Sequence, residues 1–394
     1  MFKLNGIGRC SLLVCVLLSV KVHAESFSYS QITSDTYYER TEFADMEGNT
    51  FVWEKQVGTY YDIFYWNGSS EVRITNNDEL DQAPRTSNGN VLWANYSNNK
   101  WGLNYWNGTS TTNITTGFQT VSSDYYNLSG NNAVFVGQRP GDTYSNVYKY
   151  DGSNLTRITS DQYNVYQCAV DGNNIAWYGN NRVYFYDGNS ATQVHQSSFS
   201  GNLLISGNNI AWTDKASTYG QSHVYLWNGT SVSVVSSGVM YAYVRDLRLF
   251  GDKIGWTGFE TSSKTDYEIY FYDGTTAKQL TNDSLLEYMG GINEYYAIWY
   301  GPKSGTSASS YEIFAYDGTK VINITDNSFM DAYPIVDGMN VLWQQRMGLS
   351  NNNMEIMFGT FSDPTVPEPT TLVLFGLGAI AGFLKRKGVS KENG

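Results

Sequence analysis

Short apolar runs separated by tight-turn signals dominate the pattern along this chain. The stretch from Gly172 to Gly188, GNNIAWYGNNRVYFYDG, contains a turn, an apolar and aromatic run, a second turn, another run and a closing Asp-Gly. Asn-Gly and Asp-Gly mark hairpin turns because these residues adopt positive φ at little cost. The runs alternate and are rich in β-branched and aromatic residues, which favours strands over helix. The pattern therefore predicts a series of short hairpins.

The same unit recurs eight times. The aromatic residue that ends its first run returns at steps between 35 residues (Trp177 to Trp212) and 44 residues (Trp212 to Trp256), close to the ~40–45-residue period of a propeller blade. The eight positions are Trp53, Trp93, Phe135, Trp177, Trp212, Trp256, Trp299 and Trp343. Because they alternate within strands, we expect them to form the core between blades rather than a binding platform.

Two further features complete the unit and predict how the ring closes. A second run ends at Asn-Gly or Asp-Gly, and a third leads to an Ile-Thr pair such as Ile74-Thr75, so each unit holds four short strands. The last copy, Glu355 to Phe361, lacks the Ile-Thr strand, whereas a spare one, Tyr29 to Thr33, stands near the start. We predict an all-β, eight-bladed β-propeller (alternatively seven-bladed) with four-stranded blades. Its N-terminal strand closes the last blade and leaves no exposed sheet edge.

The repeats resemble those of TolB-type propellers, in which an Ile/Leu-Thr strand precedes a loop, a Pro and a Gly turn. The best match runs from Arg73-Ile74-Thr75 through Pro84 to Gly89 and Trp93. The family's Ser-Pro-Asp-Gly turn is absent, and Ser87-Asn88-Gly89 stands in its place. The resemblance implies the fold but no particular activity, because propellers support many functions.

The N-terminus has the pattern of a secretory signal. Lys3 and Arg9 precede an apolar run, Leu12 to Val20, and Val22-His23-Ala24 offers a small-residue cleavage site. We therefore predict a signal peptide at 1–24 and a propeller domain at 25–361; an uncleaved anchor is the alternative. The signal would remove Cys10 and Cys15, leaving Cys168 as a buried apolar residue without a disulfide.

The C-terminus carries a three-part motif. Pro367-Glu368-Pro369 precedes an apolar run, Thr371 to Leu384, and then the basic cluster Lys385-Arg386-Lys387. This arrangement resembles the PEP-CTERM sorting signal of exported bacterial proteins, which implies processing by an exosortase-type enzyme. We assign 362–369 to a tether with the Pro-Glu-Pro motif and 370–394 to a transmembrane sorting segment. The basic cluster should stay inside and hold the propeller outside the membrane. A permanent tail anchor is the alternative.

Composition and charge narrow the function classes. Aromatic residues make up 15% of the 394 residues, and the net charge is −12. Without a basic stripe to neutralise phosphates, the chain is not expected to bind nucleic acid. The mature chain's two histidines, His195 and His223, occupy strand positions in the repeat and are interpreted as structural. No G-x-S-x-G, H-E-x-x-H, phosphate loop or Cys/His metal spacing occurs.

We place the candidate site on the face where loops vary. The turns between first and second and between third and fourth strands are short and uniform, whereas the opposite face carries variable loops, where function usually lies. Acids and aromatics gather in the loops that enter each first strand. The candidate binding residues are Tyr37, Tyr38, Asp78, Glu79, Asp81, Tyr125, Tyr126, Tyr163, Asp283, Glu287 and Asp331.

Three interpretations of these residues compete. Converging carboxylates could hold Ca²⁺, and aromatic faces beside carboxylates could bind sugars; alternatively, the acids cap turns and keep the rim hydrophilic. No metal site is assigned, because no loop shows a D-x-[DN]-x-[DN]-G motif.

The leading functional hypothesis is a non-enzymatic binding or matrix protein at the cell surface, with a carbohydrate or a cell-surface protein as its partner. A polysaccharide lyase or hydrolase that uses acids at the channel mouth is the second, because a carboxylate pair needs no sequence signature. A purely structural surface protein is the third.

Overall fold

The structure, a computed structural model, is an all-β ring of eight blades. It describes residues 27–34, 37–160, 162–198, 201–215, 222–236, 243–259, 267–303, 310–346 and 354–362. The chain divides into two units, residues 27–360 and residues 1–26 together with 361–394. The first unit is the propeller, and the predicted signal peptide and sorting segment lie outside the described residues. Within the described ranges, no helix is long and apolar enough to cross a membrane.

The described strands form eight four-stranded sheets. The first four blades consist of β2 (Glu39–Glu47), β3 (Thr50–Val57), β4 (Tyr60–Trp66) and β5 (Glu71–Arg73); β6 (Leu80–Ser87), β7 (Asn90–Ser97), β8 (Lys100–Trp106) and β9 (Thr111–Asn113); β10 (Thr120–Ser129), β11 (Asn132–Gln138), β12 (Asn146–Tyr150) and β13 (Leu155–Arg157); and β14 (Val165–Asp171), β15 (Asn174–Gly179), β16 (Arg182–Tyr186) and β17 (Ala191–Gln196).

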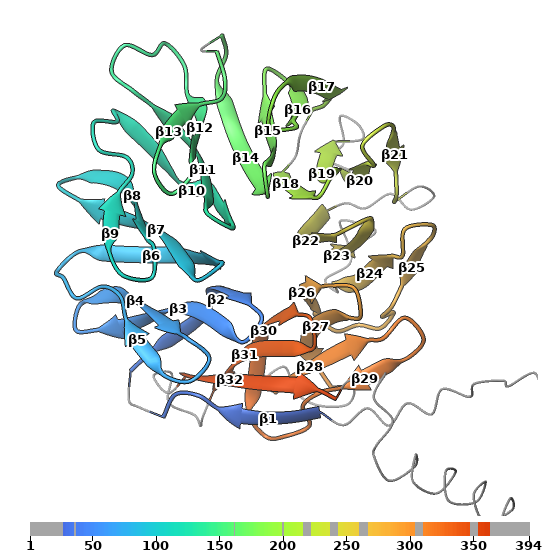
Figure 1. Cartoon of the computed structure of the whole chain (residues 1–394). Helices are drawn as coiled ribbons and strands as arrows, with labels where there is room; N and C mark the ends of the chain where they lie inside the picture. The colour runs from blue at the N-terminus through green and yellow to red at the C-terminus, as the bar shows by residue number, and fades with distance from the viewer. Residues whose placement is uncertain are drawn as a thin grey trace, which may run out of the picture. The chain divides into compact units, whose positions relative to one another are not determined.

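Blades 5 to 8 follow the same plan. They consist of β18 (Gly201–Ser206), β19 (Asn209–Lys215), β20 (Ser222–Trp227) and β21 (Val232–Val234); β22 (Tyr243–Phe250), β23 (Lys253–Phe259), β24 (Glu268–Tyr272) and β25 (Ala277–Gln279); β26 (Tyr288–Ile292), β27 (Ala297–Pro302), β28 (Tyr311–Tyr316) and β29 (Val321–Asn323); and β30 (Met330–Asp337), β31 (Asn340–Arg346), β32 (Met354–Phe361) and β1 (Phe27–Gln31). The first strand of each of blades 1 to 7 lies innermost, as does β30 in blade 8, and neighbouring inner strands contact one another around the ring (Figure 1).

The predicted closure is confirmed: β1 is the outer strand of the last blade, beside β32 (Figure 1). Ile32 N donates to Ile356 O at 2.8 Å, and Ile356 N donates to Thr33 Oγ1 at 2.9 Å. The Thr33 hydroxyl also donates to Glu355 Oε2 at 2.8 Å. The two ends of the propeller are thus joined by hydrogen bonds, which removes the free edge that β32 would otherwise expose.

The repeated aromatic residues form the core between blades, as predicted. All eight are at most 2% exposed. Trp177 of blade 4 packs with Val134 and Val147 of blade 3, and Trp93 of blade 2 packs with Val52 of blade 1. Each blade therefore buries its large ring against the preceding blade, so a single hairpin that would be marginal alone is stabilised by its neighbour.

The uniform turns form a face of their own, which we call the turn face; the opposite face is the loop face. On the turn face, the amide of a turn glycine donates to a side-chain oxygen of the preceding blade. Gly251 N donates to Ser206 Oγ at 2.9 Å, and Gly207 N donates to Asp171 Oδ2 at 2.6 Å. Further examples are Gly130 to Ser87, Gly172 to Ser129 and Gly48 to Asp337. The repeated turn therefore also fastens one blade to the next.

Candidate functional site

The inner strands are irregular where they leave the loop face. Each shows a register shift, for example between Arg40 and Asp45 in β2 and between Arg245 and Arg248 in β22. Four non-glycine residues in these bulges have positive φ, namely Ala83, Asn202, Asp246 and Tyr333. Such conformations cost on the order of 1 kcal/mol each, and they often accompany functional sites. The bulges re-aim side chains toward the channel of the ring.

One cavity lies where blades 1 and 8 meet. It has a volume of about 570 Å³, and we call it the mouth cavity. Its lining residues are Tyr38, Arg40, Glu42, Gln56, Tyr61, Arg346 and Met354. Tyr38 pairs with Met354 in an isolated bridge, which ties the start of blade 1 to the last blade. Aromatic, basic and acidic side chains thus meet at one opening.

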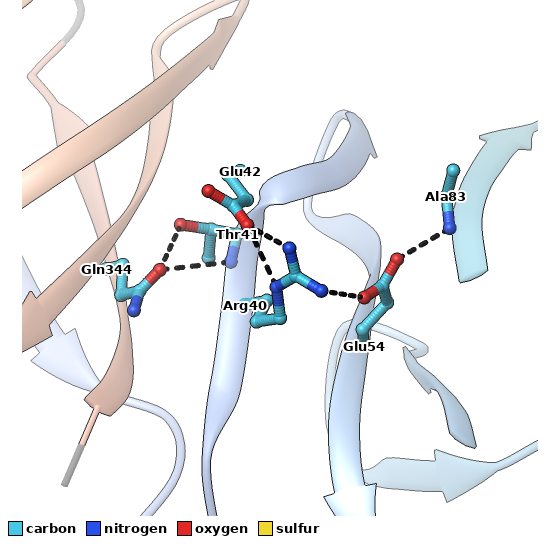
Figure 2. Close-up of polar contacts among 6 residues, drawn as sticks. All are labelled: Arg40, Thr41, Glu42, Glu54, Ala83 and Gln344. Carbon is cyan, nitrogen blue, oxygen red and sulfur yellow. Dashed lines mark hydrogen bonds and ion pairs between the residues drawn. The ribbon is translucent and has the colours of Figure 1, made fainter. Parts of the chain in front are cut away.

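Arg40 forms ion pairs with two carboxylates, Glu42 and Glu54, at the mouth cavity (Figure 2). Its Nε donates to Glu42 Oε1 at 2.9 Å, and its Nη1 donates to Glu54 Oε2 at 3.3 Å. The other oxygen of Glu54 accepts from Ala83 N of blade 2 at 2.6 Å. Burial raises the pKa of Glu54, opposed by the Ala83 amide and by Arg40. Because Glu54 is buried whereas Glu42 is exposed, only Glu42 offers a carboxylate to solvent.

Aromatic rings flank the same guanidinium. The Arg40 side chain lies 4.5 Å from the centroid of Phe43 and 5.1 Å from that of Tyr61. Next to it, Thr41 N donates to Gln344 Oε1 of blade 8 at 3.2 Å (Figure 2). Phe43 is 37% exposed. The two rings hold the planar guanidinium of Arg40 in place. The exposed part of the Phe43 ring remains accessible to a ligand.

A second cavity of about 510 Å³ lies in the channel, and we call it the channel cavity. Its lining comes from the inner strands of blades 1, 5, 6, 7 and 8 and, at Tyr300, from β27 of blade 7. The polar and aromatic lining residues are Glu42, Asp45, Arg245, Asp246, Arg248, Tyr288, Tyr300 and Tyr333. Glu42 lines both cavities, so they adjoin at this residue.

Tyrosine rings form a continuous row along the channel cavity. Tyr288 stacks on Tyr300 with centroids 5.1 Å apart, and Tyr300 lies 5.3 Å from Tyr333. Arg245 lies over Tyr288 at 5.1 Å and over Tyr267 at 5.5 Å. Burial raises the pKa of Tyr300 far above its usual range and also raises that of Tyr288. These hydroxyls therefore stay protonated at neutral pH and can donate hydrogen bonds.

Four of the predicted site residues prove to be buried within the blades. Asp81 accepts from Trp93 Nε1 and Asn95 Nδ2, both at 2.8 Å. Asp331 accepts from the equivalent Trp343 and Gln345, also at 2.8 Å. The remaining two are Tyr126, whose hydroxyl donates to Ala83 O at 2.5 Å, and Glu287, which accepts from Thr281 at 3.0 Å. These four residues do not form an accessible loop surface: Asp81 and Asp331 bond groups within their own blades, and Tyr126 and Glu287 bond the preceding blade.

The other predicted residues are scattered. Tyr37, Asp78, Tyr125 and Asp283 are exposed, and Tyr38, Glu79 and Tyr163 are half-buried. Only Tyr38 lines the mouth cavity, and Tyr125 lines a separate cavity of about 290 Å³ between blades 3 and 4. In the part of the chain that the structure describes, no group of three or more acidic, His or Cys residues could hold a metal ion. The expectation that Ca²⁺ binds stays a prediction.

Several buried acids share one hydroxyl between blades. Thr281 Oγ1 lies 2.8 Å from Glu268 Oε2 and 3.0 Å from Glu287 Oε2, and it accepts from Ile269 N at 2.9 Å. Thr33 is placed in the same way between Glu39 and Glu355. A hydroxyl has a single hydrogen, so it can donate to only one of the two carboxylates at a time.

Apart from Tyr38, the residues that line the two cavities were missed by the sequence analysis. Arg40, Glu42, Arg245, Asp246 and Arg248 lie in the inner strands and not in the loops between blades. A signal for them was present, since the first strands of blades 1 and 6 carry more charged residues than those of the other blades. The two histidines lie in the blades as interpreted. His195 packs beside Trp212, and His223 Nδ1 lies 3.2 Å from Ser236 Oγ.

Comparison with known proteins identifies the C-terminal motif. Residues 365–387 match the PEP-CTERM protein-sorting motif. This motif marks the chain for export and is a substrate signal for exosortase-type processing, which confirms the predicted sorting signal. No curated protein matches the sequence.

Solved structures resemble the propeller. The β-propeller domain of the trilobed protease from Pyrococcus furiosus matches with a TM-score of 0.50 and 13% identity, over 74% of this chain and 99% of that one. Prolyl endopeptidases match with a TM-score of 0.53 and 9% identity, over 78% of this chain but 54% of theirs. A putative TolB from Agrobacterium tumefaciens matches 44% of this chain and 66% of its own, with 18% identity and a TM-score of 0.31. At these identities the likeness concerns the fold alone: the chain is an eight-bladed β-propeller that carries a PEP-CTERM sorting motif.

Proposed function

We propose that this protein is a non-enzymatic binding protein at the cell surface or in the extracellular matrix, and that its ligand is a carbohydrate bound at the mouth cavity. The observation that carries the proposal is the Arg40 cluster, where Phe43, Tyr61, Glu42 and Arg40 meet beside an open cavity. The sorting motif supports the location, because it directs the chain out of the cell. A link to exopolysaccharide or biofilm belongs to the same proposal.

The chemistry of the mouth cavity suits a sugar chain. Aromatic faces pack against the C–H faces of a sugar ring, while the guanidinium and the carboxylate donate to and accept from its hydroxyls. The cavity volume of about 570 Å³ falls within the ~300–1,000 Å³ typical of small-ligand sites. Small sites usually combine aromatic walls with a few placed polar groups, as here.

The arrangement of the carboxylates favours binding over hydrolysis. Glycosidases need two carboxyl groups that flank the scissile bond, one of them able to donate a proton. Here Glu54 already accepts from Arg40 and from the Ala83 amide, and its side chain is only 1% exposed. Glu42 is therefore the only one of this pair that a sugar can reach.

A glycan array probed with the full chain tests the proposal, with and without Ca²⁺ and with a reducing-sugar assay on each polysaccharide bound. Tyr61→Ala removes a ring from the mouth cavity, and the neighbouring Tyr60→Ala is the matched control, because Tyr60 is exposed and does not line the cavity. We expect at least a tenfold weaker binding for Tyr61→Ala and no change for Tyr60→Ala. Release of oligosaccharides would favour the lyase or hydrolase instead. Absence of binding to every glycan would overturn the carbohydrate proposal and favour a purely structural protein.

A further inference from the structure

The wall of the channel cavity contains an arginine, Arg248, that forms no ion pair within the described part of the chain. Arg248 Nε donates to Gly290 O at 2.6 Å, and Nη1 donates to Leu247 O at 3.0 Å. Nη2 has no hydrogen-bond partner among the described residues, and no carboxylate lies within ion-pair distance of the guanidinium there. Burial lowers the pKa of Arg248. Burying a guanidinium without an ion pair costs free energy, and a bound anion would offset this cost.

Two other arginines of the inner strands, Arg245 and Arg85, interact with carboxylates. Arg245 forms an ion pair with Asp246 at 2.9 Å and lies over the Tyr288 ring. Arg85 occupies the position in β6 that Arg248 occupies in β22, because both directly follow the register shift. It faces Asp45, whose pKa it helps to lower against the dominant effect of burial. Asp246 likewise acts on the charge of Arg248, so Arg248 differs from its equivalent in lining the channel cavity and not in its backbone position.

The groups around Arg248 limit the ligand it could take. Glu42, Asp45 and Asp246 line the same cavity, and three carboxylates disfavour a dianion such as phosphate more than a singly charged group. These carboxylates can also accept hydrogen bonds from the hydroxyls of a ligand, and the neutral Tyr300 and Tyr333 hydroxyls can donate hydrogen bonds to it. A planar guanidinium matches a carboxylate in shape and charge. These features together fit a hydroxyl-rich molecule that carries one carboxylate.

We propose that the channel cavity binds a uronic-acid unit of an acidic polysaccharide and that Arg248 holds the carboxylate of this unit. The inference rests on the proposed function, which it deepens by naming the class of sugar. The volume of about 510 Å³ is within the range of small-ligand sites. Because Glu42 lines both cavities, a chain that lies in the mouth cavity can extend one unit into the channel.

The test compares trigalacturonate with its methyl ester, which has the same ring and hydroxyls but no charge. Binding of each to the full chain is measured by calorimetry for the wild type, Arg248→Met, Arg248→Lys and the matched control Arg85→Met. We expect the wild type to prefer the acid at least tenfold. Arg248→Met should lose this preference and keep its affinity for the ester, Arg248→Lys should retain part of it, and Arg85→Met should keep it.

The possible outcomes distinguish the uronate site from the carbohydrate binding on which it rests. Equal binding of acid and ester by the wild type would overturn the uronate site while leaving carbohydrate binding intact. An equal loss in Arg248→Met and Arg85→Met would overturn the role of Arg248. Competition by inorganic phosphate as strong as that by the acid would replace the carboxylate with a general anion. No binding of either sugar, together with an empty glycan array, would overturn both proposals. Thermal unfolding of each variant shows whether a loss reflects misfolding, and Arg248→Lys keeps the test decisive if Arg248→Met does not fold.

Discussion

The two faces of the ring use the same backbone units for different purposes. On the turn face, polar groups at equivalent positions repeat the same bond, as Gly251 to Ser206 and Gly172 to Ser129 do. On the loop face, equivalent positions differ: Arg248 lines the channel cavity, whereas Arg85 at the equivalent position of β6 does not. A repeated contact marks the scaffold, because each blade must be fastened to the next. A departure from the repeat marks a place where something other than a blade can be bound.

The loop face is itself divided between scaffold and surface. Its buried acids, such as Asp331, bond the aromatic core, whereas Glu42 is exposed at the mouth. Proximity to a variable loop is therefore insufficient to identify a binding residue. Burial and existing hydrogen bonds decide which acids remain available to a ligand.

The largest expected effect tests this division. Asp331→Ala leaves three donors without their acceptor: Asn327 Nδ2 at 2.7 Å, and Trp343 Nε1 and Gln345 Nε2 at 2.8 Å. Buried donors that lose their partner cost about 1–3 kcal/mol each, so we expect a loss of about 3 kcal/mol or more in the free energy of unfolding. Urea denaturation measures it. The control is Asp326→Ala in the same loop, whose side chain is 66% exposed, with an expected change within about 0.5 kcal/mol. Equal losses of stability in the two variants would contradict the distinction between buried acids that stabilise the blades and exposed acids that do not.

A pH series tests a pair of buried acids on neighbouring blades, Glu312 of β28 and Asp331 of β30. Burial raises the pKa of Glu312 above its ordinary 4.5 and raises that of Asp331 nearby, so the folded chain holds protons more tightly than the unfolded chain. The resulting stabilisation is complete below about pH 4 and is lost as the pH rises through the folded pKa values. We expect the free energy of unfolding to fall as the pH rises above about 4, by about 1.4 kcal/mol for each unit by which the folded pKa is raised.

Glu312→Gln removes one titrating group of this pair, so urea midpoints across the series should fall less steeply with pH than in the wild type. The exposed Asp78→Asn on the same face should leave the slope unchanged. A wild-type slope retained in Glu312→Gln would mean that the pair does not hold the proton.

The smallest effect concerns the turn face. Ser206→Ala removes the acceptor of Gly251 N, a bond of 2.9 Å, and should cost about 1 kcal/mol without changing glycan affinity. Thr112→Ala in β9 is the control, because Thr112 is exposed and its side chain has no partner in the described structure. Weaker glycan binding by Ser206→Ala would show that the turn face takes part in recognition, contrary to the comparison.

Much of the fold was predictable because it depends on local chemistry repeated at a fixed spacing. The aromatic at the end of the second strand, as at Trp93, gave the number of blades, and the spare strand that ends at Thr33 gave the closure. The candidate site was harder to predict from the sequence. Tyr38 was predicted, but Asp81 and Tyr126 were misplaced, because they were assigned to loops whereas they are buried in the inner strands β6 and β10.

The sequence by itself therefore determined the blades, their turns, the closing strand and the sorting motif, since each depends on residues close together or on a period. Only the tertiary structure decided which polar groups face a common cavity. Closing the ring brings Glu42 of β2 and Arg248 of β22 into the lining of one channel, although they are far apart in sequence. The inner-strand bulges also break the simple alternation of side chains along a strand, so the direction of Arg248 could not be obtained from its position in the repeat.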